Sequence, residues 1–417
     1  MMATSTIRIT TLNIGRMNNL AGVFQLVKES HILLLQEVCM DEEQLTDMVR
    51  GRGYSVVISR GEGMLGVATL VHESLPDARI DNLVPGRLQQ CQLGGYRILN
   101  VYAPAGTNLA PQRREFFSTS LLAACRKERL VIGGDYNSVV DPLDVEENFR
   151  NKRSIELRQI VQTFNLQDFY RVQNMQRITF TFNRPGSTSA RLDRFYSSQD
   201  IQDGLVTHTP TLSDHMAVTL EVDFQLTVGR QERWQGRWKL NVSVLRDRNL
   251  RTHIQDLITN ADLTDINQWE FLKETIVERL KEFSTLKNQF RRTTFQMVMW
   301  GLERALEEKN WEDVAHAKAR IKDMVEHINH GYMIRARSSK EDAEEVATIY
   351  HATKEMKRGK QACLSKLKIG GVVEEDSATI KQEVRDYYQA LYNGHHCTLG
   401  GQVVNTGVNF TPCWQDE

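Results

Sequence analysis

The feature that most constrains this chain is the stretch at residues 130–138, which reads LVIGGDYNS. Its apolar part is too short for a helix and ends on two glycines, after which come Asp135 and Asn137. This pattern predicts a buried strand with polar groups at its C-terminal end, where sites on sheets are usually built. A neighbouring carboxylate and amide can bind a divalent cation, accept a proton from water or donate to a phosphate oxygen. An Asx turn gives the same local pattern, so the functional interpretation depends on the other strand ends.

Further apolar or alternating segments fill the first half of the chain. Helices are expected at residues 18–29, 112–127 and 155–164. Many short strands and few helices predict an α+β fold, with two packed sheets and helices outside them. The other strands are expected at residues 7–12, 32–35, 54–58, 66–71, 97–102, 179–182, 192–196 and 216–222.

Length and composition narrow the class of protein. A chain of 417 residues is too long for one ordinary domain. The net charge of −1 gives no global field for a polyanion, which disfavours a coat or packaging role but not an enzyme that grips a few phosphates. The six cysteines have no framework spacing, as in a reducing compartment. No signal pattern begins the sequence and no apolar run approaches about 18 residues, so we expect an intracellular protein without a membrane partner.

The second half of the chain has a different character. We place the first domain at residues 1–225 and a polar linker at 226–244. Residues 245–392 have helical periodicity, dense Lys, Arg and Glu, and few glycines or prolines, so they predict an α-helical region. Residues 393–417 show little periodicity and are expected to be poorly ordered.

Polar residues at the ends of the expected strands form a candidate constellation. Alone, each has an ordinary explanation as a turn, cap, rim or core residue, but their coincidence is harder to explain by structure alone. Together they could hydrolyse a phosphate ester, which needs a cation, an activated water and donors for the transition state. The set is Asn13, Glu37, Tyr102, Asp135, Asn137, Thr181, Asp193, Asp214 and His215.

Each part of that chemistry has a candidate residue. Glu37, helped by Asn13, offers the hard oxygen ligands that Mg²⁺ prefers. Asp135 could orient or deprotonate the water, while Asn137 could hold the water or a phosphate oxygen. His215, as an imidazolium, could stabilise the phosphate or protonate the leaving oxygen, with Asp193 as the carboxylate on its other nitrogen.

Seven short motifs carry a family resemblance over residues 7–222. The segment resembles the endonuclease/exonuclease/phosphatase superfamily, and within it the apurinic-type endonuclease domain of non-LTR retrotransposon polyproteins. Tyr136 stands where that family usually has Phe, and Phe182 where many relatives have Trp. The motifs are Leu12-Asn13, residues 35–38 (LQEV), 100–104 (NVYAP), 133–137 (GGDYN), 181–182 (TF), 191–194 (RLDR) and 213–215 (SDH).

The resemblance implies a four-layered α/β sandwich of two mixed sheets flanked by helices. It implies DNA nicking that leaves a 3′-hydroxyl and depends on Mg²⁺, with Mn²⁺ as the alternative ion. It would make Asp135, Asn137 and His215 the catalytic centre, with Asp193 as the partner of His215. The remaining roles it implies are Glu37 as metal ligand, Asp214 as an acid at the metal edge, Asn13 as helper of metal and phosphate, Tyr102 as phosphate contact, and Thr181 and Arg191 as substrate contacts.

The second half resembles the connector that precedes reverse transcriptase in such polyproteins, through residues 235–241, the basic helices and residues 384–392. No adjacent Asp-Asp pair is present to hold polymerase metals. We therefore expect an element truncated after its connector, or a host open reading frame derived from one. DNA is the expected partner, and the nucleus, with the cytoplasm as an alternative, is the expected compartment. The basic clusters at 150–153 and 287–292 could bind element RNA, although a solvated helix face explains them equally well.

Two rival functions stay open. One is a phosphatase or RNA deadenylase with the same catalytic plan, against which the nuclease-like segment at residues 189–194 argues. The other is a non-catalytic, transposon-derived nucleic-acid-binding protein, against which the complete residue set argues. Phosphate release without DNA nicking would favour the first, and binding without cation or cleavage would favour the second.

Overall fold

The computed structural model describes residues 4–15, 23, 27, 30–49, 52–61, 65–147, 149–226, 240, 242–261, 266–336, 367–369, 372–374 and 376–392. The helix expected at residues 18–29, most of the expected linker and the tail at 393–417 lie largely or wholly outside these residues.

The first of two large sheets has the strand order β11-β12-β1-β2-β4-β3. β1 runs parallel to β2 and antiparallel to β12, so the sheet is mixed. The apolar run that begins at Ile32 lies near its centre because such a strand needs both faces covered. The bounds are β1 Thr4–Asn13, β2 Ile32–Val38, β3 Tyr54–Arg60, β4 Gly66–His72, β11 Leu205–Thr209 and β12 Ala217–Gln225.

The second sheet has the order β5-β6-β7-β8-β10-β9. β8 is its inner strand, parallel to β7 and antiparallel to β10. The stretch that ends on Asp135 is therefore a fully buried strand, as its apolar run predicted. The bounds are β5 Arg79–Val84, β6 Leu88–Leu93, β7 Tyr96–Tyr102, β8 Leu130–Asp135, β9 Gln167–Asp168 and β10 Asp193–Ser197.

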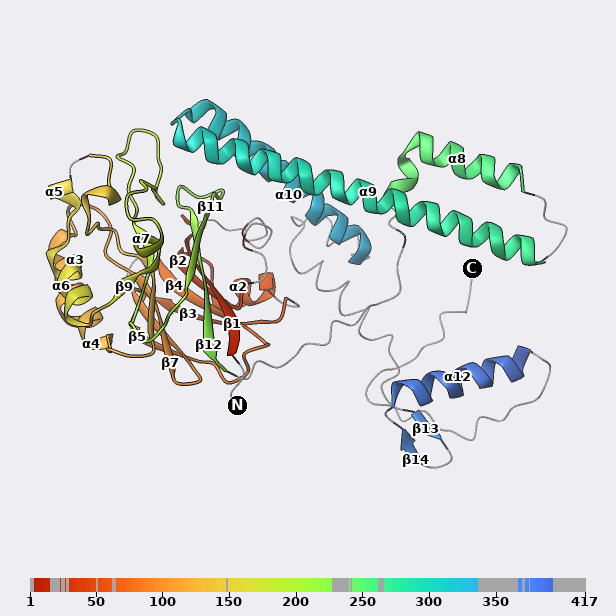
Figure 1. Ribbon diagram of the computed structural model, residues 1–417, viewed down its shortest axis with the longest axis horizontal. Helices are drawn as coiled ribbons and strands as arrows, with labels where there is room; N and C mark the ends of the chain where they lie inside the picture. Colours follow the sequence, from red (N-terminus) through yellow and green to blue (C-terminus); the bar gives the residue numbers. More distant parts are fainter. Residues whose placement is uncertain are drawn as a thin grey trace.

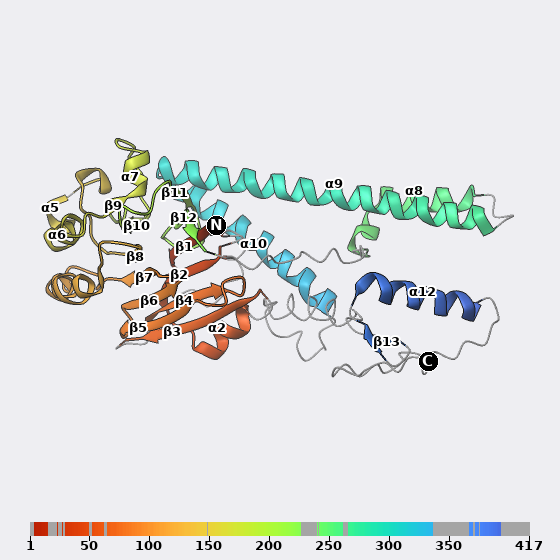
Figure 2. The ribbon, with the colours of Figure 1, turned by 60° about the horizontal axis from the view of Figure 1, so that its bottom comes forward.

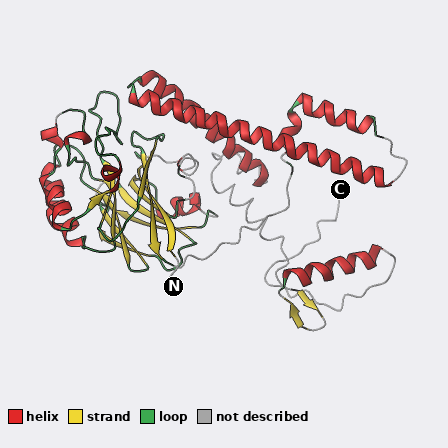
Figure 3. Ribbon diagram, viewed as in Figure 1, coloured by secondary structure: helices red, strands yellow, loops and turns green. Residues whose placement is uncertain are grey.

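The two sheets pack face to face, with helices on both outer faces (Figures 1 and 3). Between them lies an apolar core that includes Ile9, Leu34, Ile98, Val131 and Leu220. A separate core lies between the second sheet and its helices. The two packed sheets with outer helices were predicted from the pattern of the sequence, and the family resemblance implied this four-layered sandwich. The helices of this half are α2 Glu42–Val49, α3 Ala110–Phe116 continued by a π turn at Phe117–Leu121 and α4 Leu122–Ala124, a 3-10 turn at Pro142–Asp144, α5 Phe149–Lys152, α6 Ile155–Thr163 and α7 Phe169–Gln173.

Some element predictions were wrong. Residues 179–182 are not a strand: only Phe182 forms isolated bridges, to Ala190 and His215. In this half, strands β5, β6, β9 and β11 and helices α2, α5 and α7 were not predicted. In β6 the reason is visible, because Gln89 and Gln90 are buried polar residues in the middle of the strand and break the apolar pattern.

The described part of the second half is mainly helical, as predicted, although it also contains one short hairpin of two strands that was not predicted. α8 (Arg248–Thr259) packs against the first part of α9 (Ile266–Glu307) through Leu250 and Leu280. Lys309 adopts a left-handed φ of 53° between α9 and α10 (Trp311–Ala336), which turns back along α9. Figure 2 shows α9 extending as a long arm from the sandwich. A 3-10 turn (Val242–Arg246), the two short strands β13 (Leu367–Ile369) and β14 (Val372–Glu374), and α12 (Ser377–Tyr392) complete the described chain.

The hairpin of α9 and α10 covers part of the outer face of the first sheet. Val298 and Leu302 of α9 and Ile321 of α10 belong to the same buried cluster as Leu33 and Leu35 of β2. The hairpin is thus part of the sandwich's outer layer. Among the described helices, none is both long and apolar enough to span a lipid bilayer.

Candidate catalytic site

The site lies where strand ends of both sheets meet. Asn13 ends β1, Tyr102 ends β7 and Asp135 ends β8. In the second sheet, Asp135 pairs with Tyr102 on one side and with Asp193, the first residue of β10, on the other. Strand pairing alone therefore sets three of the predicted side chains next to one another.

Two site residues have a backbone conformation that side chains other than glycine seldom adopt. Glu37 has φ of 55° at the bulge where the pairing of β2 with β4 shifts, and Asn137 has φ of 46°. A bulge re-aims a side chain relative to the regular pleat, and left-handed non-glycine residues concentrate at functional sites. The bulge turns Glu37 toward Tyr102 and Asn13, to which its carboxylate is bonded.

One half of the site is a hydrogen-bonded chain centred on Asn13. Its Nδ2 donates to Glu37 Oε1 at 3.2 Å and to Asp135 Oδ2 at 2.9 Å, and Tyr102 Oη donates to Glu37 Oε1 at 3.1 Å. Asn137 holds the same carboxylate of Asp135, from its backbone N to Oδ1 at 2.9 Å and from its Nδ2 to Oδ2 at 3.2 Å. Asp135 is therefore fixed from two sides.

The other half is a chain that ends on His215. Its Nδ1 lies 2.8 Å from Asp193 Oδ2, which also accepts a hydrogen bond of 2.7 Å from Thr181 Oγ1. The backbone N–H groups of Leu192 and Asp193 both donate to that same hydroxyl. Thr181 thus positions Asp193, and Asp193 orients the imidazole.

Burial and charge set the protonation states. Burial and, less strongly, the Asp193 carboxylate raise the pKa of Asp135 to about 6, with the His215 ring opposing them. Burial disfavours the charged form of His215, but the Asp193 carboxylate and its hydrogen bond outweigh it and raise the pKa of His215 to about 10. Burial, with Glu37 and Asp135 nearby, raises the pKa of Tyr102 well above its usual value. At neutral pH the site therefore combines an ionised Asp135 with an imidazolium.

The donor set suits a hard divalent cation. Asp135, Asp193 and His215 offer ligand atoms within 4.8 Å of one another. Asp193 Oδ1 is buried and has no hydrogen-bond partner among the described residues, although a buried carboxylate oxygen ordinarily has one. Because Asp193 engages His215 Nδ1, carboxylate oxygens are better ligands here than the imidazole for an ion such as Mg²⁺.

Asp214 lies on the turn between β11 and β12, beside the end of β1. Ser213 Oγ donates to the Asn13 carbonyl at 2.9 Å and accepts from the His215 backbone N–H at 3.2 Å. A side chain at Gly15, where φ is 55°, would come within 3.1 Å of Ser213 Oγ and 3.4 Å of Asp214 Oδ1. The turn and the end of β1 are therefore closely packed, and Asp214 lies beside Asn13's strand end.

Arg191 is not placed with these residues. Its side chain is 1% exposed, and its guanidinium binds Asp144 at 2.9 Å and Asp168 at 2.6 Å. Asp144 also binds Arg171 and Arg194, so the pKa of Asp144 is held well below its usual value despite burial. The substrate contact predicted for Arg191 stays a prediction, and the structure places that guanidinium in an interior ion-pair network.

Sequence reasoning gave no role to a polar bridge beneath the site. Gln36 Nε2, from β2, donates to Asn100 Oδ1 of β7 at 2.8 Å, and Asn100 Nδ2 donates to the Ala68 carbonyl at 3.1 Å. The bridge ties the two sheets together directly behind Glu37 and Tyr102. The sequence did contain a pattern that indicates this bridge: in each of two apolar strands, an amide side chain lies one or two positions before a site residue.

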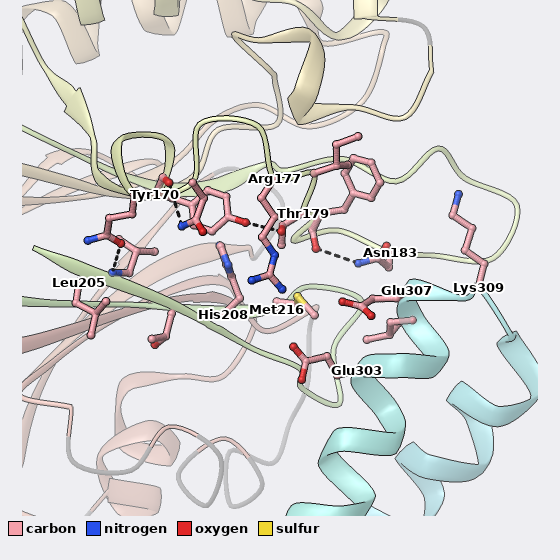
Figure 4. Close-up of a pocket in the computed structure, with 17 residues that line it drawn as sticks. Tyr170, Arg177, Thr179, Asn183, Leu205, His208, Met216, Glu303, Glu307 and Lys309 are labelled. Atoms are coloured by element: carbon pink, nitrogen blue, oxygen red, sulfur yellow. Dashed lines mark hydrogen bonds between the residues drawn. The ribbon is translucent and has the colours of Figure 1, made fainter.

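A cavity of about 790 Å³ lies beside this site, between α7, β11 and the end of α9. Figure 4 shows Arg177 and His208 on one wall and Glu303 and Glu307 on the other, with Met216 between them. Met216 directly follows His215 in the chain. The cavity therefore adjoins the catalytic cluster without containing it.

The first half of the chain matches a known protein family. Residues 10–215 match the model of the Endonuclease/Exonuclease/phosphatase family. A curated relative, the Transposon TX1 uncharacterized 149 kDa protein of Xenopus laevis, is 25% identical over 365 residues, which cover 79% of this chain. The chain spans only 27% of that relative's length.

Three solved structures are similar to about half of the chain. An AP endonuclease from Archaeoglobus fulgidus is 20% identical with a TM-score of 0.42, over 51% of this chain and 98% of the other. The AP endonuclease LMAP from Leishmania major is 18% identical with a TM-score of 0.45, over 52% and 88%. The endonuclease domain of TRAS1, a telomere-specific non-LTR retrotransposon, is 16% identical with a TM-score of 0.38, over 53% and 100%.

Proposed function

Residues 10–215 form a domain of the endonuclease/exonuclease/phosphatase family, and from this premise we propose that the chain is a divalent-cation-dependent DNA endonuclease. It would hydrolyse one phosphodiester bond and leave a 3′-hydroxyl, as target-primed retrotransposition requires. The observation that carries the proposal is the pair of hydrogen-bonded chains, one from Tyr102 to Asp135 and one from Thr181 to His215. The transposon relative supports DNA as the substrate class.

Glu37 and Asn13 would hold the cation, with Asp214 as a further acid at its edge. When bound, Mg²⁺ or Mn²⁺ would supply positive charge next to the phosphate. Tyr102 Oη is bonded to Glu37 and its phenol stays protonated, so it can donate to a phosphate oxygen.

Asp135 would act on the attacking water. With a pKa of about 6 it is ionised at neutral pH, yet more basic than an ordinary aspartate, which suits a general base. Asn13 and Asn137 both donate to Oδ2 of this carboxylate, and the Asn137 backbone N–H donates to its Oδ1, so its orientation is fixed. Water then attacks phosphorus while the bond to the 3′ oxygen breaks.

His215 would balance the charge that develops in this step. Its imidazolium is stabilised by Asp193, so it carries a proton at neutral pH that it can donate to a phosphate oxygen or to the departing 3′ oxygen. Thr181 keeps Asp193 in place for this role.

The test is nicking of supercoiled plasmid. The wild type with Mg²⁺ should convert it to open circles, and a DNA polymerase should extend the nicks directly because they end in a 3′-hydroxyl. Asp135→Asn and His215→Gln should each slow nicking by about 100-fold or more. Asp223→Asn, at an exposed acid of β12, and His253→Gln, at an exposed position of α8, serve as matched controls and should nick normally.

An intact plasmid with wild-type protein across several salt concentrations would overturn the proposal. Phosphate release from small phosphate esters by that same protein would then point to the phosphatase function instead.

A further inference from the structure

The α9–α10 hairpin reaches the catalytic turn through one side chain. Lys318, on α10, donates from its Nζ to the backbone carbonyl of Ser213 at 2.6 Å. We propose that Lys318 is a positioning residue for the turn that carries Asp214 and His215, so that the helical hairpin is a working part of the nuclease. This inference rests on the endonuclease activity proposed above.

The hairpin is anchored on both sides of this contact. Leu302 of α9 and Ile321 of α10 have no exposed surface in the cluster that covers the first sheet. At the hairpin's turn, Lys309 forms an ion pair with Glu146 of the sandwich. Lys318 therefore projects from a helix that is held in place, which lets its contact with Ser213 act as a fixed support.

Partial burial disfavours the charged form of Lys318, and the hydrogen bond to Ser213 offsets this effect. Burial lowers the pKa of Lys318, and Asp214 opposes that shift. A partly buried ammonium group is unfavourable unless it is hydrogen-bonded or paired. Here the Ser213 carbonyl accepts a hydrogen bond from the ammonium group of Lys318. The Asp214 carboxylate lies close enough to favour the positive charge of Lys318.

Ser213 passes this support on to the catalytic residues. Its hydroxyl joins the Asn13 carbonyl to the His215 backbone N–H, and Thr211 Oγ1 donates to the His215 carbonyl at 2.6 Å. Fixing the Ser213 carbonyl therefore limits movement of both the end of β1 and the start of β12. The distance from His215 Nδ1 to Asp193 depends on that turn, and small misplacements of catalytic groups cost large factors in rate.

The experiment compares substitutions on one helix of the full chain. Lys318→Met keeps the length of the side chain but removes its donor and charge, and we expect the kcat for plasmid nicking to fall about tenfold with KM within about twofold of wild type. Lys318→Arg keeps donor and charge and should recover most of that loss. Lys322→Met, one turn along α10, removes a lysine that is 70% exposed and should leave kcat unchanged.

Hydrogen exchange gives a readout that does not need activity. In Lys318→Met the His215 amide, which donates to Ser213 Oγ, should exchange faster, while amides in β2 and β8 keep wild-type rates. Wild-type kcat in folded Lys318→Met, or wild-type exchange at residues 213–215, would overturn the inference. Inactive wild-type protein would instead refute the proposed function, and exchange would still decide the role of Lys318.

Discussion

The 2.8 Å contact between His215 Nδ1 and Asp193 Oδ2 sets the charge of the site. A histidine in an apolar interior would be neutral, because burial lowers its pKa. His208 shows this behaviour in the same domain, since burial lowers the pKa of His208 to about 3. His215 differs because the buried Asp193 carboxylate accepts a hydrogen bond from the ring and stabilises its positive charge.

This difference predicts the pH profile of nicking. The rate should rise as Asp135 ionises near pH 6, and a bound cation would move that limb lower. The rate should fall as His215 loses its proton near pH 10.

The substitution Asp193→Asn removes the charge that stabilises the imidazolium of His215, so the alkaline limb of the profile should move down by several pH units. Rates measured from pH ~5 to ~10.5 test this. An alkaline limb that stays in place in Asp193→Asn, while Asp200→Asn behaves as wild type, would exclude the imidazolium.

For single residues, the sequence predicted most of the polar side chains that the fold brings together, but it did not predict that Arg191 lies in an interior ion-pair network. The ends of apolar strands are visible in a sequence, and pairing of neighbouring strands brings them together. The partners of Arg191 are Asp144 and Asp168, which lie 47 and 23 positions away. No local pattern shows which arginine of a polar segment turns inward to meet such distant acids.

Among the elements, β8 depends most on its glycines. A Cβ at Gly133 would lie 2.3 Å from the Phe195 ring, and one at Gly134 would lie 2.0 Å from the Val101 carbonyl oxygen, at a φ of 151°. The two glycines let β8 fit between β7 and β10 and against the first sheet. Gly133 and Gly134 are therefore needed for the packing of β8 as well as for the access of a ligand to Asp135.

Gly134→Ala should consequently destabilise the fold by at least about 3 kcal/mol, because the clash is with backbone that cannot move aside. Gly301→Ala is the opposite case. Apart from the backbone of the helix itself, no atom of the described residues lies within 4 Å of a Cβ at Gly301 in α9, so that substitution should stabilise by about 0.5–1 kcal/mol. Urea unfolding of both variants measures this, and equal midpoints would contradict the packing role of Gly134.

Elements were predictable where the apolar pattern was clean. β2, β8 and β12 read directly from their sequences, whereas β6 was hidden by buried glutamines that bond to other strands. Residues 179–182 alternate like a strand, but only Phe182 finds bridge partners. A strand is defined by its neighbours, which the sequence of one segment does not contain.

For the whole molecule, the decisive feature is the docking of α9 and α10 on the first sheet. The helices were expected, but their amphipathic pattern does not say which surface they cover. Part of α9 stays uncovered: Leu286, Phe290 and Trp300 are exposed. The apolar positions that pack inward, such as Val298 and Leu302, look no different in the sequence.

If the hairpin and the sandwich share one core, a cavity in that core should weaken both. Leu302→Ala should cost about 2–5 kcal/mol, and helix and sheet signals should melt together. Leu286→Ala, at a residue that is 64% exposed, should change stability by less than about 0.5 kcal/mol. Chemical unfolding followed by circular dichroism reports the helices, and hydrogen exchange at amides of β2 and β8 reports the sheets. Separate transitions, with the sandwich indifferent to Leu302→Ala, would contradict a shared core.

The shared core also decides how this protein can be cut into pieces. A recombinant fragment ending near residue 225, where β12 stops, would strip the hairpin from the first sheet and leave Leu33, Leu35 and Leu70 without that part of their cover. An exposed hydrophobic surface of this kind promotes aggregation. Fragments that extend past Ala336, the last residue of α10, should therefore purify in higher yield.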